Sequence, residues 1–418
     1  MPRAHPVEFE VIRNIYDLPT TMLAGLPWHL RGCKTRREVF DETVREVKRF
    51  TAFYEGEPLP FEEVMAFAWS HLCNIHENKV RLVWGYPNAA FQVEAQYAYP
   101  LMSEIRSMEQ CPIAWGWETL KGGMRKVEHT AQHHKLFVLY VGLDWTKFDK
   151  SGSADIINDA FSILKGHLIM RRTGDEKCWD WIVRYFMETP IRLSNGERYR
   201  KLGGVPSGTT FTQMIDSDYN IIVINYLCRK CFDRFPDFGI YMGDDSLLMF
   251  RKDFNFYWNR LAVVVQGQLC MSVKIAKSFI TRDHNQIEFL GFHNQDGFTT
   301  RPFDSWMQSF MMPEYSDKNI GDVCSRALGL LYAMCGVNVS AYNVFASFLR
   351  EKIPQVSYSR PRIGGNLGRF LRLHGLLAEI PSCDSIFQRM LFEPRDDEEI
   401  VNLHESLLFE SDFELSNE

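Results

Sequence analysis

The sequence predicts a protein of the α/β class, in which short antiparallel strands are combined with amphipathic helices. Residues 238–250 read FGIYMGDDSLLMF, and two apolar runs around a Gly-Asp turn signal are typical of a β-hairpin. Residues 136–143 form a near-continuous apolar run, as central strands covered on both faces do. Residues 212–231 form a long stretch with helical periodicity.

Length and composition describe a large globular chain. Of its 418 residues, 45% are hydrophobic and 14% aromatic, which is ample for buried cores. The sequence has no run of about 18 apolar residues and no signal-peptide core near its start, so we expect a soluble protein with no membrane partner. The ten scattered cysteines favour reduced interior thiols of an intracellular protein.

Charge is distributed unevenly along the chain. The net charge is −6, but residues 393–418 carry −9 and the other 392 residues carry +3. The body is therefore mildly basic, which leaves nucleic acid open as a partner. An acidic tail of this kind is more often a solvated appendage than a functional arm, although it can also compete with RNA for a basic groove.

The N-terminal part predicts two helices followed by a basic strand. Residues 35–54 place their apolar side chains on one helical face, and a second helix is predicted over residues 61–73. Lys79 and Arg81 then fall on a β-rich stretch that ends at Pro87, with both side chains on the same side. Taken alone, this pair favours a solvated face over a phosphate contact.

Two acidic residues follow the apolar run at 136–143. Asp144 ends this run, and a carboxylate at the end of a buried strand is held by a rigid element, as metal ligands usually are. Asp149 follows five residues later. Taken alone, Asp144 is equally compatible with a strand-ending turn.

A basic hairpin, a glycine-rich loop and a helix come next. Residues 191–201 predict a hairpin around Asn195-Gly196, and GGVPSGTT follows it. Ser207 and other hydroxyl residues crowd the start of the helix at 212–231, where free backbone N–H groups attract anions and sugars. An ordinary Ser/Thr cap after a glycine loop is an equally good interpretation.

The remaining chain predicts a helix after the 238–250 hairpin, a strand carrying Lys274 and Lys277, a further strand ending in FLGF, and a helix-rich region over residues 317–352. A lone lysine is normally a solvated surface residue.

Asp244 and Asp245 lie at the expected hairpin tip, where adjacent like charges repel unless a cation lies beside them. An isolated Gly-Asp-Asp is more often a solvated turn. Together with Asp144, however, these residues supply three strand-end carboxylates, and Mg²⁺ prefers oxygen ligands. Two such ions about 3.5–4 Å apart activate an attacking hydroxyl and stabilise a leaving oxygen in phosphoryl transfer.

The order and spacing of these segments resemble the right-hand RNA-dependent RNA polymerases of RNA viruses. Residues 144–149 (DWTKFD) resemble motif A, residues 207–212 (SGTTFT) resemble motif B, and residues 243–245 (GDD) resemble motif C. RLVWGYP, VGLDWTKFDKS, GVPSGTTFTQMIDS and the FLGF box are most similar to partitivirus polymerases, with picobirnavirus polymerases as near relatives. The resemblance covers about residues 75–295.

The resemblance implies fingers, a palm with an antiparallel sheet packed on helices, and a helical thumb. The implied divisions are 1–135 (N-terminal extension and fingers), 136–150 (palm, motif A strand), 151–201 (fingers insertion), 202–299 (palm, motifs B to E), 300–392 (thumb) and 393–418 (acidic tail).

The resemblance also assigns metal and catalytic roles. Asp144 and Asp244 are implied as the principal ligands of Mg²⁺, or alternatively of Mn²⁺, with Asp245 as an auxiliary ligand. Lys277 is implied as the acid that protonates the pyrophosphate leaving group, and Lys274 is its rival.

The implied nucleotide-binding residues are Lys79, Arg81, Asp149, Ser207, Gly208, Thr212 and Asn220. Lys79 and Arg81 correspond to the cations that clamp the triphosphate, and Asp149 reads the ribose 2′-hydroxyl, which is both a donor and an acceptor. Many family members carry Asn four residues after the motif B Thr. This chain has Asp216 there and Asn220 one turn later.

The implied function is template-directed synthesis of RNA from ribonucleoside triphosphates, by which a double-stranded RNA viral genome is replicated and transcribed. The implied partners are the RNA template and product, ribonucleoside triphosphates and a viral capsid protein, in the host cytoplasm inside the virus particle. One alternative is a reverse transcriptase-like polymerase, against which Asp149 argues because DNA synthesis favours a bulky residue there. Another is a non-catalytic RNA-binding protein with a polymerase-like fold, against which the intact aspartates argue.

Overall fold

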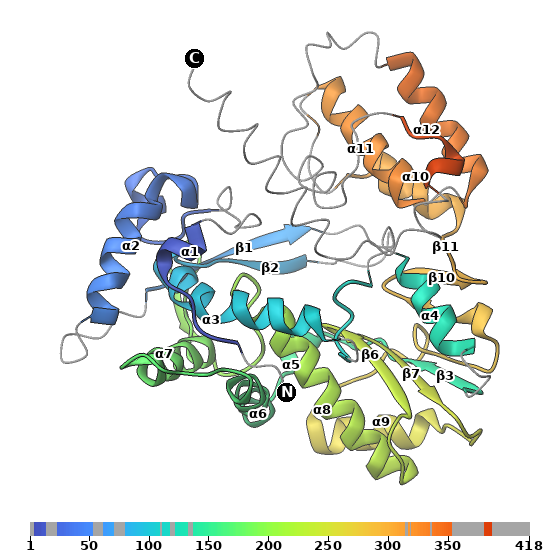
Figure 1. The fold of residues 1–418 in the computed structure, drawn as a ribbon, viewed down its shortest axis with the longest axis horizontal. Coiled ribbons are helices and arrows are strands. Elements are labelled where there is room, and N and C mark those ends of the chain that lie inside the picture. The colour runs from blue at the N-terminus through green and yellow to red at the C-terminus, as the bar shows by residue number, and fades with distance from the viewer. Residues whose placement is uncertain are drawn as a thin grey trace. The chain divides into compact units, whose positions relative to one another are not determined.

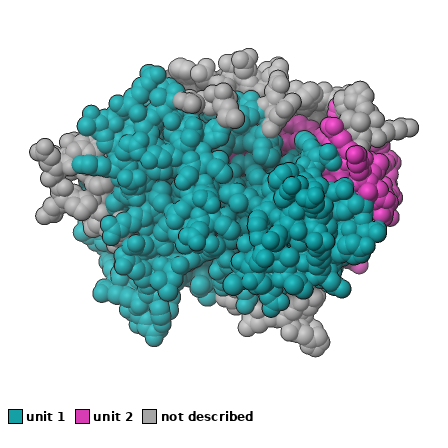
Figure 2. Space-filling view, turned by 90° about the horizontal axis from the view of Figure 1, so that it is seen from below, with its two compact units in different colours: residues 1–113, 141–248, 254–279 teal, residues 114–140, 249–253, 280–418 magenta. Residues whose placement is uncertain are grey.

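A computed structural model describes residues 4–13, 23–52, 62–70, 80–108, 111–117, 122–132, 137–313, 317, 319–334, 337–352 and 380–386. Two compact units make up the chain (Figure 2). Unit 1 comprises residues 1–113, 141–248 and 254–279, and unit 2 comprises residues 114–140, 249–253 and 280–418. Lys79 and the acidic tail lie outside the described residues.

One sheet of unit 1 has the strand order β2-β1-β4-β5. Its strands are β1 (Val64–Ser70), β2 (Val80–Gly85), β4 (Pro190–Arg192) and β5 (Arg198–Arg200). The β4–β5 pair confirms the predicted hairpin around Asn195-Gly196. Arg81 lies within β2, which confirms the predicted strand.

The predicted helix over residues 61–73 is wrong, because this segment contains strand β1. Its residues pair antiparallel with β2, from Met65 opposite Gly85 to Ser70 opposite Val80. A short apolar run suits a buried helix and a strand equally well, so the presence of an edge to pair with decides between them.

The helices of unit 1 include α1 (Phe9–Arg13), α2 (Arg36–Ala52), α3 (Asn88–Ser107), α5 (Phe148–Ser151), α6 (Ala154–Gly166), α7 (Asp175–Met187), α8 (Thr212–Phe232) and α9 (Trp258–Leu269). Helices α2 and α8 confirm the predictions over 35–54 and 212–231. Helix α8 runs beside the hairpin of β6 (Phe238–Met242) and β7 (Asp245–Phe250), as Figure 1 shows, and is buried at twelve positions, so it forms the central support of this unit.

A second sheet has the order β6-β7-β3-β8. Its strands are β3 (Leu139–Gly142), β6 (Phe238–Met242), β7 (Asp245–Phe250) and β8 (Phe279–Thr281). The predicted hairpin is confirmed, and the interior strand β3 is buried throughout, as its apolar run predicts. A Cβ at Gly142 would lie 2.2 Å from the Phe279 ring, so this close approach requires glycine.

The predicted strand carrying Lys274 and Lys277 is wrong. These residues lie in a turn, in which Lys277 N and Ser278 N both donate to Lys274 O at 3.0 Å, and β8 begins only at Phe279. A turn forms here instead of a strand because its backbone is hydrogen-bonded to the segment that carries Asp144.

Unit 2 contains helix α4 and an antiparallel sheet of order β11-β10-β9. Its elements include α4 (Gly123–Gln132), η4 (His284–Gln286), β9 (Glu288–Phe289), β10 (Phe292–Gln295), β11 (Phe298–Thr300), α10 (Phe303–Met311), α11 (Ile320–Ala333) and α12 (Val339–Lys352). The last two helices confirm the helix-rich region predicted over 317–352, and α10, α11 and α12 enclose a core around Trp306, Leu331 and Phe345. Within the described residues, no helix has the length and apolar character to cross a membrane.

Candidate active site

The tip of the β6–β7 hairpin is held by helix α8. Gly243 adopts φ +64°, and a Cβ there would lie 3.1 Å from Gln213 Nε2, so glycine suits both the turn and the space. Gly243 N donates to Ser217 Oγ at 3.0 Å. Asp244 and Asp245, which follow, are exposed. The two carboxylates thus lie on a tip whose backbone is fixed.

Asn220 joins this tip to the segment that carries Asp144. Its Nδ2 donates to Gly243 O at 2.9 Å, and its Oδ1 accepts from Trp145 Nε1 at 3.1 Å. The side chain is fully buried. Both ends of this amide are therefore used inside the protein, and the structure gives Asn220 a positioning role. Its contact with a nucleotide stays a prediction.

Asp144 lies two residues beyond β3 and is paired with Lys274. Lys274 Nζ lies 2.7 Å from Asp144 Oδ1, and the side chains are 42% and 37% exposed. The backbones are bonded as well, since Lys274 N donates to Asp144 O at 2.8 Å. Lys277 is exposed three residues further along the turn. Of the two rival lysines, Lys274 is thus the one that contacts a predicted metal ligand.

The loop that carries Ser207 and Gly208 lies against strand β2. Ser207 Oγ donates to Leu82 O at 3.2 Å. Gly208 has φ +112°, and a Cβ there would lie 2.5 Å from Trp84 O, so only glycine permits this approach. The hydroxyl of Thr212 donates to Pro206 O at 2.8 Å, inside the same loop. Loop and strand together bring the motif B residues beside the strand of Arg81.

The same loop is bonded to the residues around Asp149. Val205 N donates to Asp149 O at 2.7 Å, and Gly204 N donates to Gly152 O at 2.9 Å. Asp149 itself has an exposed side chain. The predicted sugar-reading carboxylate and the glycine-rich loop are therefore neighbours.

Asp216 is a buried carboxyl of this site whose Oδ1 has no hydrogen-bond partner. Burial raises its pKa well above the usual range, and the charges of Asp149 and Asp244 raise the pKa further. Lys201, whose own pKa is lowered to about 7 by burial, opposes this shift. Asp216 thus lies within the electrostatic influence of the two predicted site carboxylates, Asp149 and Asp244.

The predicted metal ligands fit a hard divalent cation in donor chemistry and in charge. Asp144, Asp244 and Asp245 offer carboxylate oxygens, which Mg²⁺ prefers, and the Lys274 ammonium already occupies a cation position on Asp144. Among the described residues, these three do not form a group whose ligand atoms all lie within 4.8 Å of one another. Such a group is formed by Glu128, His284 and Asp296.

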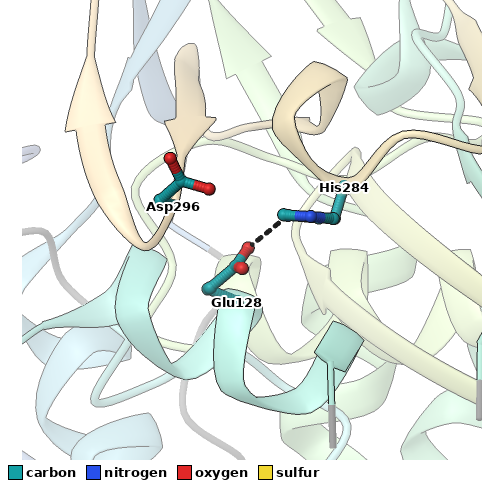
Figure 3. Close-up of side chains that lie close together, drawn as sticks. All are labelled: Glu128, His284 and Asp296. Atoms are coloured by element: carbon teal, nitrogen blue, oxygen red, sulfur yellow. Dashed lines mark hydrogen bonds and ion pairs between the residues drawn. The ribbon is translucent and has the colours of Figure 1, made fainter. Parts of the chain in front are cut away.

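This second group lies in unit 2 and was not predicted from the sequence. Figure 3 shows Glu128 on α4 reaching His284, with Asp296 on the adjoining hairpin turn. His284 Nδ1 lies 2.9 Å from Glu128 Oε2, and Asn294 Nδ2 donates to the same oxygen at 2.6 Å. Asp296 Oδ1 accepts from Asn285 Nδ2 at 2.9 Å. Protein donors therefore already occupy both carboxylates, and the group is a hydrogen-bonded junction between α4 and the hairpin.

Asp218, also on α8, provides a prediction about stability and pH. It is buried with Oδ2 unpartnered, and burial raises its pKa to about 7 from 3.8. The folded state therefore favours the protonated form, and the free energy of unfolding falls as pH rises from about 4 to about 7. We expect Asp218→Asn to remove this fall and to stabilise the protein at pH 8 by about 2–4 kcal/mol. Urea unfolding at pH 5.5 and pH 8 measures the effect.

The control is Asp159→Asn, which changes an exposed aspartate on α6. In this variant, the difference in the free energy of unfolding between pH 5.5 and pH 8 should be the same as in the wild type. If the stability of Asp218→Asn depends on pH as strongly as that of the wild type, Asp218 is not the source of the fall in stability.

The fold, with acidic segments at Asp144 and at Asp244–Asp245, is that of a right-hand polymerase. The crystal structure of the RNA-dependent RNA polymerase of a human picobirnavirus superposes with a TM-score of 0.64 at 15% identity, covering 93% of this chain and 71% of that one. The family described as viral RNA-dependent RNA polymerase matches residues 23–355. The chain belongs to this family. Its members generally use a divalent metal.

Two viral relatives are named RNA-directed RNA polymerase. That of Atkinsonella hypoxylon virus is 26% identical over 374 residues, covering 75% of this chain and 53% of the relative. That of White clover cryptic virus 1 is 25% identical over 288 residues, covering 62% and 46%. The chain therefore spans about half the length of these curated relatives. These findings confirm the partitivirus-like resemblance, whereas the proposed subdomain divisions stay predictions.

Proposed function

We propose that the chain performs template-directed synthesis of RNA from ribonucleoside triphosphates. The observation that carries this proposal is the junction at Asn220, which ties the Asp244 tip to the segment following Asp144 in a chain of this family. A nucleotidyl transferase needs its carboxylates held rigidly in this way, because small displacements of the reacting groups slow the reaction greatly.

We assign Asp144 and Asp244 as principal ligands of Mg²⁺, with Asp245 as auxiliary ligand and Mn²⁺ as a possible replacement. The bound ions supply activation of the attacking 3′-hydroxyl and charge stabilisation of the leaving pyrophosphate. Lys274 balances the charge of Asp144, and Ser278 Oγ accepts from Asp144 N at 3.0 Å, so this ligand is held on both sides.

For the nucleotide, we assign Asp149 to the ribose 2′-hydroxyl. Ser207, Gly208 and Thr212 shape the pocket beside it, and Asn220 supports the pocket from within the core. We assign Lys79 and Arg81 to the triphosphate, since β2, which contains Arg81, lies against the Ser207 loop.

We further propose that the polymerase replicates and transcribes a double-stranded RNA genome in the host cytoplasm, inside a particle formed by a capsid protein. The relatives from Atkinsonella hypoxylon virus and White clover cryptic virus 1 are both named RNA-directed RNA polymerase, which supports a role in viral RNA synthesis. A reverse transcriptase-like activity is disfavoured by Asp149, and a non-catalytic RNA-binding role by the retention of all three aspartates.

The deciding test is incorporation of labelled ribonucleotides on an RNA template with Mg²⁺ or Mn²⁺. We expect metal-dependent incorporation that strongly prefers ribonucleotides over deoxyribonucleotides. Preference for deoxyribonucleotides would favour the reverse transcriptase alternative, and RNA binding without incorporation under either metal would favour the non-catalytic one.

The two lysines of the turn after α9 give a further prediction. If Lys277 protonates the leaving pyrophosphate, Lys277→Leu should lower kcat by about 100-fold with KM little changed, because removal of a general acid costs about this much. Single-turnover kinetics measure the effect. Lys274→Leu is the matched comparison three residues away, and a loss of kcat confined to that variant would transfer the acid role to Lys274.

A further inference from the structure

Glu94 on helix α3 contacts the motif B loop through a single oxygen. The side chain is fully buried. Its Oε2 accepts from Thr209 Oγ1 at 2.7 Å, from Thr210 N at 2.9 Å and from Thr210 Oγ1 at 2.9 Å. Three donors from two consecutive residues converge on this one oxygen, so the contact fixes the position of the loop.

The two threonines lie between Gly208 and the start of helix α8. Thr209 Oγ1 also accepts from Phe211 N at 3.2 Å, which continues the contact to the helix N-terminus. Gly208, immediately before them, is pressed against Trp84 O of β2. Glu94 therefore holds one side of the loop while β2 holds the other.

The buried surroundings of Glu94 disfavour the ionised form of its carboxyl. Burial raises its pKa to about 7, and its Oε1 has no hydrogen-bond partner. Arg36 of α2, buried over the Phe91 ring at 4.0 Å, lowers the pKa by its charge. Burial also raises the pKa values of Tyr86 and Tyr185, and the charge of Glu94 in turn raises them further. An apolar side chain would fill this core position at a lower free-energy cost of burial. The carboxyl is therefore best explained by its hydrogen bonds to the loop.

We propose that Glu94 is a positioning residue of the nucleotide site, which holds the loop at residues 207–212 through Thr209 and Thr210 in the conformation that receives the incoming nucleotide. This inference rests on the proposed polymerase function. Because the contacts are made with the loop and not with the reacting groups, Glu94 should govern nucleotide affinity more than the chemical step.

The test compares Glu94→Leu with Glu94→Gln and with Gln92→Leu. Gln92 is equally buried on α3, but its Nε2 donates to Phe40 O at 3.1 Å, away from the loop. Two quantities are measured in the full chain, namely hydrogen exchange of peptides covering residues 203–214 and the KM and kcat of ribonucleotide incorporation. The first is independent of activity.

We expect Glu94→Leu to speed exchange of these peptides and to raise KM by about tenfold with kcat changed less than about threefold, since the loop loses its three hydrogen bonds to Glu94 while the reacting groups keep their contacts. Glu94→Gln keeps an acceptor oxygen and should restore most of the wild-type behaviour. Gln92→Leu should lower thermal stability and leave exchange of the loop and KM unchanged.

Unchanged exchange and KM in Glu94→Leu, or equal changes in Gln92→Leu, would overturn the inference. If Glu94→Leu does not fold, Thr210→Val removes the hydroxyl partner from the loop side and must change exchange and KM in the same direction. A wild type that shows no incorporation while the loop exchange responds as expected would refute the polymerase function and leave the contact with the loop established.

Discussion

Replacing Asp244 by alanine is expected to reduce ribonucleotide incorporation by at least about 1,000-fold, because it removes a principal metal ligand that the neighbouring Asp245 only assists. Changing Asp244 and Asp245 together to alanine should abolish synthesis. Both variants should bind RNA nearly as the wild type does, since phosphate contacts depend on lysine and arginine. Incorporation assays and binding titrations at one salt concentration measure the two effects.

The control is Asp180→Ala, which removes an exposed aspartate of helix α7. It should leave incorporation unchanged. Incorporation by Asp244→Ala at the wild-type rate would refute the metal assignment and, with it, the catalytic proposal.

Replacing Asn220 by leucine is expected to destabilise the protein by about 2–4 kcal/mol, since each buried polar group left unsatisfied costs about 1–3 kcal/mol. The substitution leaves Gly243 O at the hairpin turn and Trp145 Nε1 beside Asp144 without their side-chain hydrogen-bond partner, and it keeps the branching and the number of heavy atoms of the side chain. Urea unfolding measures the loss. Incorporation should fall as well under conditions in which the variant is folded, because the two acidic segments lose their common tether.

The matched control is Asn225→Leu on the same helix. Asn225 Nδ2 donates only to Ile221 O, one turn earlier in α8, at 2.8 Å. This variant should lose less than about 1 kcal/mol, as ordinary substitutions of this kind do. Equal losses in both variants would show that Asn220 acts through helix stability and not through the turn.

Several predictions that rested on local pattern agree with the structure. The alternating apolar runs and the glycine at 243 determined the β6–β7 hairpin, the apolar run determined β3, and helical periodicity determined α2 and α8. The site residues that follow these elements, such as Asp144 and Asp244, could be found because each lies two residues after a strand. Their assignment to a polymerase required the order of three motifs.

Predictions that depended on a distant partner were decided only by the tertiary structure. Residues 64–70 became a strand because β2 offers an edge, and Lys274 lies in a turn because its backbone and ammonium bind Asp144. Asn220 faces the core because Trp145 and Gly243 satisfy its amide.

The sequence by itself determined strand β3 and the β6–β7 hairpin, which carry the two acidic segments, and helix α8 beside them, because hydrophobic periodicity and turn chemistry act over a few residues. Only the tertiary structure decided what supports them. Glu94 reaches Thr210 across 116 residues, and His284 reaches Glu128 across 156, and no local pattern specifies such pairs. Burial and hydrogen-bond satisfaction select these partners, and both depend on where the folded chain brings distant segments together.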